Sequence, residues 1–360
     1  MSTVRNLTAA YTLEVETNEE KSKSLIPELP DEITELCLYR IPYPYQSQVR
    51  SVSSSWNKAI SHPSFLYTKN QLSLSLPYLF VFAFHKSTAE VQWQAMDVKS
   101  GRWFVLPPMP CPKAVCPPSF ACASIPHEGK LYVMGGMRSD TGYTMGTMIT
   151  YRTSTNQWLV PSPMRTPRAF FSAGNINGKI IVVGGNEIDL DVELYDPEHD
   201  KWVEGAKMHS KLAKYDAVVV GRKLYITEGW TWPFVFSPRE DTWQEMSDGM
   251  REGWTRMGMV MGDRIFVISE HCDCRMKVYH PDEDTWEFVD GERFPCNALM
   301  RPFAVSAVEG RIYVVSSGLN VAIGRVFEEQ MGKFWVDWEV VDAPEAFHEF
   351  SPSNCLLLYA

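Results

Sequence analysis

The residues best placed to do chemistry lie in the segment KIIVVGGNEIDLDVELYDPEHDKW, at 179–202. Its apolar run ends in Gly184 and Gly185, and glycines that follow a strand cradle the phosphates of dinucleotides in many enzymes. That site requires G-x-G-x-x-G at the start of a helix. Here the glycines precede the acidic sequence NEIDLD, which would repel a phosphate, and then VELY, which alternates as a strand does. The pattern excludes a dinucleotide loop.

Two groups of cysteines could bind a metal ion. One is the sequence HCDC at residues 271–274, and the other is a looser set formed by Cys111, Cys116 and Cys122. A structural zinc site usually has two matched halves with C-x2–4-C spacing, and neither group has its second half. Eight cysteines in 360 residues do not form a disulfide framework. We therefore expect no metal, no cofactor and no disulfide network.

The glycine segment belongs to a repeat. KLYVMGG at 130–136 is an upstream copy, and weaker copies begin with KLYITEG at 223, RIFVISE at 264 and RIYVVSSG at 311, while LFVFAF at 79–84 opens an earlier one. Each copy ends in a tryptophan, and the intervals between these tryptophans are 55, 44, 41, 43 and 52 residues. The six tryptophans are Trp103, Trp158, Trp202, Trp243, Trp286 and Trp338.

An interval of roughly 40–50 residues with about four short strands is typical of a propeller blade. Glycine ends a strand where a Cβ would be forbidden, and the tyrosine and tryptophan fill the space between neighbouring sheets. We predict an all-β, six-bladed propeller over 77–360. The first copy lacks one strand, and NCLLLYA at 354–360 is an unassigned strand at the other end. We expect that segment to join the first blade and close the ring.

Composition limits the partners. The chain is 45% hydrophobic, with a net charge of −10 and a pI near 5.4, and this acidic balance argues against nucleic acid or an anionic membrane as a main partner. The beginning of the chain has no secretory signal pattern, and the apolar run at 79–84 is too short to cross a bilayer. We expect an intracellular protein of the nucleus or the cytoplasm.

The N-terminal region differs from the repeats in its pattern of polar and apolar residues. Residues 1–24 are polar and predict a disordered tail, whereas 25–67 show helical spacing and 68–76 form a connection. A helix is expected to begin at the sequence Pro-Asp-Glu and to end before Pro42. Val49, Val52 and Trp56 predict a second amphipathic run. Such a small helical module is marginal alone and would gain from a partner.

This region resembles the F-box. The second proline pair and the V-x-x-x-W spacing support the similarity, although Ser53, Ser54 and Ser55 replace the Cys and basic residues often found before the tryptophan in the family. The resemblance implies that the region binds a Skp1-like adaptor. The matching, and therefore predicted adaptor-binding, residues are Leu29, Pro30, Ile33, Leu36, Leu38, Ile41, Pro42, Val49, Val52 and Trp56.

An F-box followed by repeats of this kind is similar to the plant F-box/kelch-repeat proteins. The resemblance implies a non-catalytic substrate receptor of an SCF ubiquitin ligase, linked through its adaptor to a cullin, with plant light signalling as a suggested setting. Kelch-type specifier proteins bind iron through E-x3-D-x3-H, but here Glu187 and Asp191 are followed by Tyr195. The alternatives are a kelch scaffold outside the ubiquitin pathway and an enzyme or small-molecule sensor in the propeller tunnel.

A target-binding surface is predicted from basic residues that precede the first strand of several blades, and from tryptophans in nearby loops. Arginine and tryptophan concentrate binding energy at protein interfaces. The alternative is that the basic residues bridge neighbouring blades and the tryptophans pack locally. The candidates are Arg168, Lys214, Arg256, Arg301, Trp230, Trp232 and Trp254.

Overall fold

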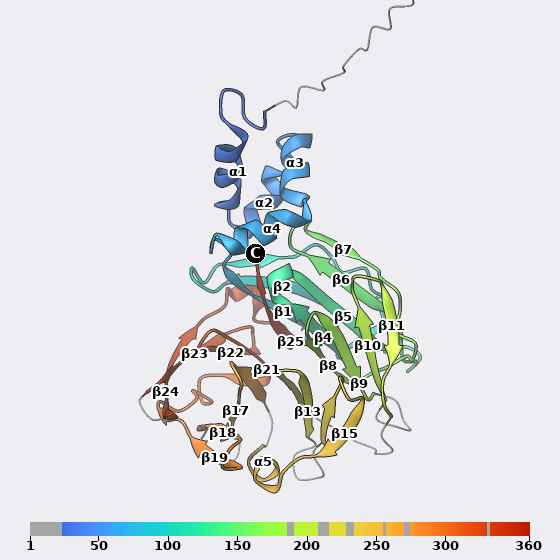
Figure 1. The fold of residues 1–360 in the computed structure, drawn as a ribbon, viewed down its shortest axis with the longest axis vertical. Coiled ribbons are helices and arrows are strands. Elements are labelled where there is room, and N and C mark those ends of the chain that lie inside the picture. Colours follow the sequence, from blue (N-terminus) through green and yellow to red (C-terminus); the bar gives the residue numbers. More distant parts are fainter. Residues whose placement is uncertain are drawn as a thin grey trace, which may run out of the picture.

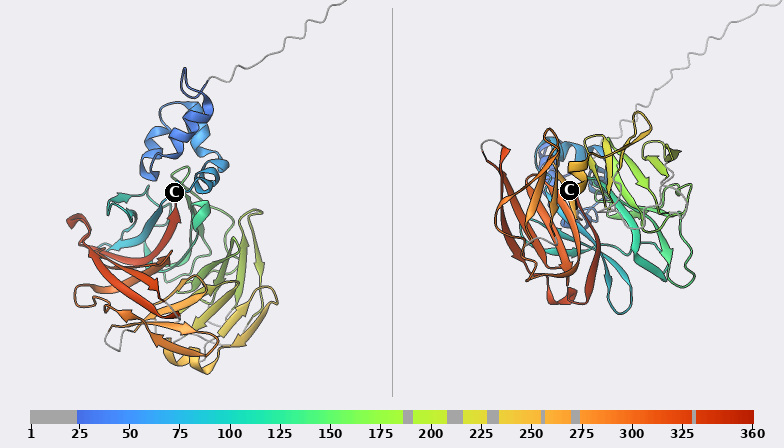
Figure 2. Two further views of the ribbon diagram at one scale, coloured as in Figure 1. Left: turned by 60° about the vertical axis from the view of Figure 1, so that its left-hand side comes forward. Right: turned by 90° about the horizontal axis from the view of Figure 1, so that it is seen from below.

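Four helices precede the sheets along the chain and lie to one side of them in space (Figure 1). The computed structural model describes residues 24–185, 191–207, 216–227, 234–254, 257–269, 274–329 and 332–360. The N-terminal helices form a helical module that contacts the propeller near the end of the C-terminal strand, and two further views show the same arrangement (Figure 2). Its helices are α1 (Asp31–Tyr39), α2 (Tyr43–Val49), α3 (Ser54–Ser61) and α4 (Pro63–Gln71).

Local sequence explains where these helices begin. Acidic residues occupy the first turn of α1, where they complement the helix dipole. Pro44 lies in the first turn of α2, where a missing N–H costs nothing. The side chain of Ser53 accepts a hydrogen bond from the backbone N–H of Trp56 at 3.1 Å and caps α3. The single amphipathic run predicted over 49–56 is therefore wrong, because α2 ends at Val49 and α3 begins after this cap.

Six sheets form the propeller predicted from the repeat. Blade one has β25 (Phe350–Tyr359), β1 (Pro77–His85), β2 (Val91–Asp97) and β3 (Trp103–Val105); blade two has β4 (Val115–Ile125), β5 (Lys130–Arg138), β6 (Met148–Arg152) and β7 (Gln157–Leu159); blade three has β8 (Ser172–Ile176), β9 (Lys179–Val183), β10 (Val192–Asp196) and β11 (Lys201–Glu204). Blade four has β12 (Asp216–Val220), β13 (Lys223–Thr227), β14 (Phe234–Ser237) and β15 (Thr242–Glu245); blade five has β16 (Gly258–Met261), β17 (Arg264–Ile268), β18 (Met276–His280) and β19 (Thr285–Phe288); blade six has β21 (Met300–Val308), β22 (Arg311–Ser317), β23 (Val321–Glu328) and β24 (Phe334–Val341), with β20 (Asp290–Gly291) parallel to β24. Short helical turns connect some strands, namely η1 (Pro126–Glu128), α5 (Asp248–Gly253) and η3 (Glu345–Phe347).

The C-terminal strand closes the ring. β25 pairs antiparallel with β1, placing Leu357 opposite Leu79 and Leu356 opposite Phe80. It also contacts β4 of blade two and β21 of blade six, so it takes the inner position that the first strand holds in the other blades. The strand starts at Phe350, four residues before the predicted segment, and it pairs with the inner edge of β1.

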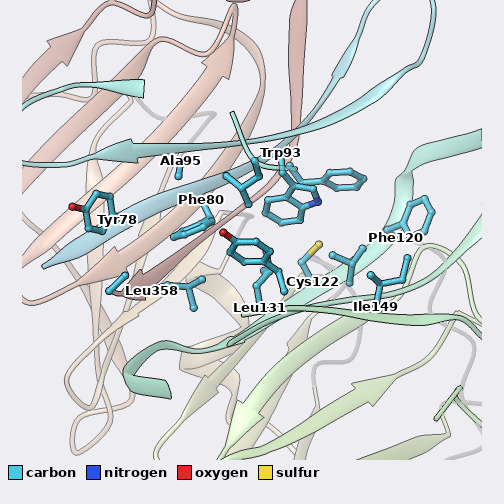
Figure 3. Close-up of a cluster of buried hydrophobic side chains, with 14 of the residues drawn as sticks. Tyr78, Phe80, Trp93, Ala95, Phe120, Cys122, Leu131, Ile149 and Leu358 are labelled. Carbon is cyan, nitrogen blue, oxygen red and sulfur yellow. The ribbon is translucent and has the colours of Figure 1, made fainter. Parts of the chain in front are cut away.

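Buried side chains fill the spaces between neighbouring blades. Between blades one and two, Phe82 stacks on Trp93 at a centroid distance of 5.0 Å, and Leu358 of β25 joins the same cluster (Figure 3). Leu131 and Ile149 complete it from blade two. A sheet has two faces and a single blade can cover neither, so each blade depends on its neighbours.

The recurrent Tyr, Asp and Trp residues fasten one blade to the loop that enters it. In blade three, Trp202 Nε1 donates to the carbonyl of Ser162 at 2.9 Å, while Asp200 accepts from the N–H of Ser162 at 2.9 Å and from the hydroxyl of Tyr195 at 2.7 Å. The same tryptophan-to-backbone bond occurs from Trp158 to Pro107, from Trp243 to Ala206 and from Trp286 to Met250. The repeat therefore encodes contacts between blades.

The paired glycines let the end of a strand approach this loop. Gly135 and Gly185 have φ angles of 63° and 76°, in the left-handed region. A Cβ at Gly135 would lie 2.4 Å from the carbonyl oxygen of Arg168, and one at Gly185 would lie 2.8 Å from that of Ala169. The glycines are therefore required by chain geometry, which agrees with the exclusion of a phosphate loop.

Candidate functional site

The outer surface of the helical module carries exposed apolar side chains. Ile33 is 47% exposed and Leu36 is 36% exposed, both on α1, while Val52 is 63% exposed in the turn between α2 and α3. α1 and α3 stand away from the propeller, and α4 lies against it (Figure 1). Large apolar side chains on a module this small are a feature of surfaces that bind other proteins.

The other predicted adaptor residues hold the module together or border that surface. Leu38 is buried beside Ile60 and Phe65, which corrects the prediction that it contacts a partner directly. The partly buried residues Ile41, Val49 and Trp56 pack against this core, and the indole N–H of Trp56 donates to the carbonyl of Leu25 at 2.7 Å. Leu29 is half-buried, and Pro30 and Pro42 are exposed.

Specific contacts dock the helical module onto blade two. The hydroxyls of Tyr43 and Tyr151 are 2.5 Å apart in a buried hydrogen bond, and Arg50 donates to the carbonyl of Ser154. The side-chain amide of Asn70 donates to the carbonyl of His127 at 2.6 Å. Burial raises the pKa of Tyr43 far above its usual range, so its hydroxyl stays protonated and available for this bond.

These docking residues were not predicted from the sequence. Tyr43 lies between two prolines, and neither Arg50 nor Asn70 belongs to an apolar period. The one available signal was an aromatic residue flanked by two prolines. The partner residues are more than 50 positions away along the chain, and no local pattern connects them.

The opposite face of the propeller is the one with the predicted target-binding residues. Ser353, near the start of β25, donates its hydroxyl to the carbonyl of Pro117 near the start of β4. Ser124, near the end of β4, donates to the carbonyl of Leu357 near the end of β25. The two strands therefore run in the same direction. Because β25 ends beside the helical module, the inner strands begin on the propeller face that points away from this module, which we call the far face. Arg168 precedes β8. Two residues later, the backbone N–H of Phe170 donates to the carbonyl of Ser119 near the start of β4, so Arg168 lies on the far face. Arg301 lies near the start of β21, whose Met300 pairs with Ser317.

Arg168 is buried, which contradicts the prediction that it lies on an exposed binding surface. It is 0% exposed, and its guanidinium donates to Asp191 at 2.6 Å and to Glu193 at 2.7 Å. A third bond goes to the carbonyl of Gly184 at 2.6 Å. These contacts tie the loop before β8 to β10. For Arg168, the alternative of a structural brace is the one observed.

Trp254 is also buried, and its indole N–H donates to Asp216 at 3.2 Å. The prediction that Trp254 belongs to an exposed target-binding surface is therefore wrong, because its side chain packs between blades four and five. Arg301 is exposed, with its guanidinium carbon 5.4 Å from the centre of the Phe303 ring. The remaining candidates, Lys214, Arg256, Trp230 and Trp232, lie outside the described residues.

One pair of cysteines departs from expectation. Cys274 and Cys296 form a disulfide with their Cα atoms 6.5 Å apart, within the usual range. It joins residues 22 positions apart, which no sequence motif links. Cys272 and His271 of the HCDC sequence lie outside the described residues. Of the other cysteines in the described ranges, Cys122 and Cys355 are buried, which raises the pKa of both thiols.

Comparison with known proteins agrees with this two-part architecture. An F-box domain model matches residues 26–68, and a Kelch motif model matches residues 167–209. Among Arabidopsis thaliana proteins, the chain is 49% identical to F-box protein AFR over 94% of both chains, and 38% identical to F-box/kelch-repeat protein At1g30090 over 94% of this chain and 88% of that protein. The chain belongs to the plant F-box/kelch-repeat family. In these terms, α1–α4 form the F-box and the six blades form the kelch propeller. Within the described ranges, every helix is too short or too polar to cross a bilayer.

Proposed function

We propose that this protein is a non-catalytic substrate receptor of an SCF-type ubiquitin ligase. Its F-box would bind a Skp1-like adaptor and, through it, a cullin, while its propeller holds a target protein. The observation that carries this proposal is the exposed apolar surface of Ile33, Leu36 and Val52 on an F-box whose opposite side is fastened to the propeller. A buried attachment to the propeller on one side and an apolar surface on the other suit a module that joins the propeller to another protein.

The far face of the propeller is the proposed target-binding surface. It carries the exposed side chains of Tyr143, Phe170, Met300 and Arg301. Tyr143 belongs to this face because its β5–β6 loop pairs with the segment before β8, where Met145 opposes Arg168. Aromatic residues, methionine and arginine are enriched in protein interfaces. The F-box lies at the other end of the inner strands, so adaptor and target would be bound at separate ends of the molecule.

Co-purification tests the adaptor role. Ile33→Glu combined with Val52→Glu places two charges in the exposed apolar surface and should abolish co-purification with a Skp1-like adaptor while leaving the melting temperature unchanged. The matched control is Leu72→Glu, which adds a charge at an exposed apolar residue beyond α4. Equal adaptor recovery from both variants would overturn the proposed adaptor-binding surface. Recovery of the adaptor without a cullin would favour a scaffold outside the ubiquitin pathway.

A role in plant light signalling is a further proposal, supported by the similarity to F-box protein AFR. It predicts that targets captured by the propeller differ in abundance between dark-grown and light-grown tissue. Quantitative co-precipitation from the two tissues measures this, and identical target profiles would contradict the proposal.

A further inference from the structure

A cavity of about 710 Å³ lies between the F-box and blade two, away from both proposed protein-binding surfaces. One wall comes from the end of α3 and from α4, and the other from η1, the start of β5 and the loop after β6. Its size falls within the range of small-molecule sites. The residues that concern its chemistry are Tyr67, Asn70, His127, Lys130, Arg152 and Thr155.

Charge on the propeller wall favours an anion. Lys130 and Arg152 stand directly opposite each other in the β5–β6 pair, so two cations share one side of the sheet. Like charges in this position repel each other unless they are neutralised. Glu128 neutralises Lys130 at 2.6 Å, whereas the guanidinium of Arg152 makes no ion pair with any residue in the described part of the chain. Arg152 is exposed and lines the cavity, so its guanidinium is available to an anionic group that enters there.

The F-box wall supplies an apolar surface. Tyr67 on α4 is 66% exposed although it lines a cavity between two domains, and Pro63 and Leu66 lie on the same wall. An exposed aromatic ring can stack on a flat ligand. The wall opposite Arg152 is therefore suited to the hydrocarbon part of a molecule whose anionic group reaches the guanidinium.

Two of the lining residues each have a buried polar atom that accepts no hydrogen bond from the described residues. Asn70 Oδ1 and Thr155 Oγ1 are shielded from solvent and have no hydrogen-bond partner among the described residues. A buried polar atom without a partner costs free energy, so a rotation of either side chain toward the cavity would gain a hydrogen bond to a hydroxyl or amine of a ligand. Asn70 comes from the F-box and Thr155 from the propeller, so one molecule could bridge the two domains.

We propose that this cavity binds a small aromatic acid, with its carboxylate or phosphate on Arg152 and its ring against Tyr67. Binding requires the docked arrangement of the two domains and therefore stabilises that arrangement by mass action. The site does not depend on adaptor or target binding, so the proposal can fail while the proposed function holds, and the reverse.

Calorimetry with defined probes tests the proposal on the full chain. Phenyl phosphate and 4-hydroxybenzoate represent the two anions, and benzyl alcohol is the neutral counterpart. We expect saturable millimolar binding of at least one acid and none of the alcohol. The preferred acid shows whether the site is built for phosphate or for carboxylate. Arg152→Gln and Tyr67→Ala should each weaken binding by about tenfold, the effect of losing one good contact.

The matched control is Arg222→Gln, an exposed arginine on the β12–β13 turn of blade four, which does not line the cavity. It should leave the affinity unchanged, and all three variants should melt at the wild-type temperature without ligand. Equal weakening by Arg152→Gln and Arg222→Gln would overturn the proposal, as would equal binding of benzyl alcohol. Failure of both acids to bind at millimolar concentration would also overturn it.

Discussion

Arg168 and Glu193 form a buried ion pair at 2.7 Å that joins the loop entering blade three to the third strand of that blade. Glu193 also accepts from the backbone N–H groups of Arg165 and Thr166, at 2.8 and 3.1 Å. One carboxylate thus holds both the arginine and the backbone that precedes it. This relationship explains why a basic residue is required at a position that resembles a binding site in the sequence.

Removing Arg168 should destabilise the propeller. Arg168→Met leaves Asp191 and Glu193 buried without their cation, and breaking a buried pair in this way costs about 3–5 kcal/mol. The free energy of unfolding from urea denaturation measures this loss.

Arg301→Met is the matched control, because Arg301 is exposed. It should change the unfolding free energy by less than about 0.5 kcal/mol. If the two variants proved equally stable, the bracing role of Arg168 would be wrong.

Ring closure makes the C-terminal residues essential to the whole propeller. Deleting 354–360 removes most of β25 and exposes β1, β4 and β21 at once, so the fold should lose its cooperative melting transition. Leu358→Ala, at a fully buried position, should cost about 2–5 kcal/mol.

Thermal melting followed by circular dichroism checks both variants. Val340→Ala in β24 is the control, since this side chain is 38% exposed and its truncation should cost less than about 1 kcal/mol. A truncated chain with the wild-type melting temperature would show that β25 is dispensable.

The sequence predicted contacts that repeat and missed those that occur once. The Trp and Tyr periods identified the blades because every blade solves the same packing problem. Arg168 was correctly located along the chain, but its environment depends on Glu193, which is 25 residues away on another strand. Leu38 and Val52 both match the F-box pattern, and only the helix packing separates the buried one from the exposed one. The contact of Tyr43 with Tyr151 spans 108 residues and follows no period.

Lys69 should give the F-box an unusual pH dependence. The residue is 2% exposed, and its ammonium donates to the carbonyl of Ile41 at 3.1 Å. Burial lowers the pKa of Lys69 from the usual 10.5 to about 8. The unfolded chain therefore binds more protons than the folded chain between pH 8 and 10.5. Through Lys69, the free energy of unfolding therefore increases as the pH rises from 8 to 10.5. Below pH 8, the full cost of burying the charged ammonium applies.

Lys69→Met removes this penalty and should raise stability at pH 7 by up to about 3 kcal/mol, since one pKa unit corresponds to about 1.4 kcal/mol. The carbonyl of Ile41 keeps a donor, the side-chain amide of Gln46 at 3.2 Å. Melting temperatures at pH 7, 8.5 and 10 should rise with pH in the wild type relative to Lys69→Met. Lys58→Met, at an exposed lysine of α3, should behave as the wild type does. A constant difference between wild type and Lys69→Met at all three pH values would contradict the lowered pKa.

Arg301 is the one described basic candidate that remains exposed on the proposed target-binding face, and it lies next to the exposed side chain of Met300. Because the chain as a whole carries a charge of −10, a cation here would attract an acidic or phosphorylated segment of a target, and salt would weaken the attraction. Arg301→Glu should therefore reduce target capture without lowering the melting temperature. Quantitative co-precipitation from plant extract, repeated at low and high salt, measures capture, and Arg222→Glu on the opposite face is the control. Targets retained equally by both variants at low salt would place the binding surface elsewhere on the propeller. Capture lost together with thermal stability would mean that Arg301 braces the fold as Arg168 does.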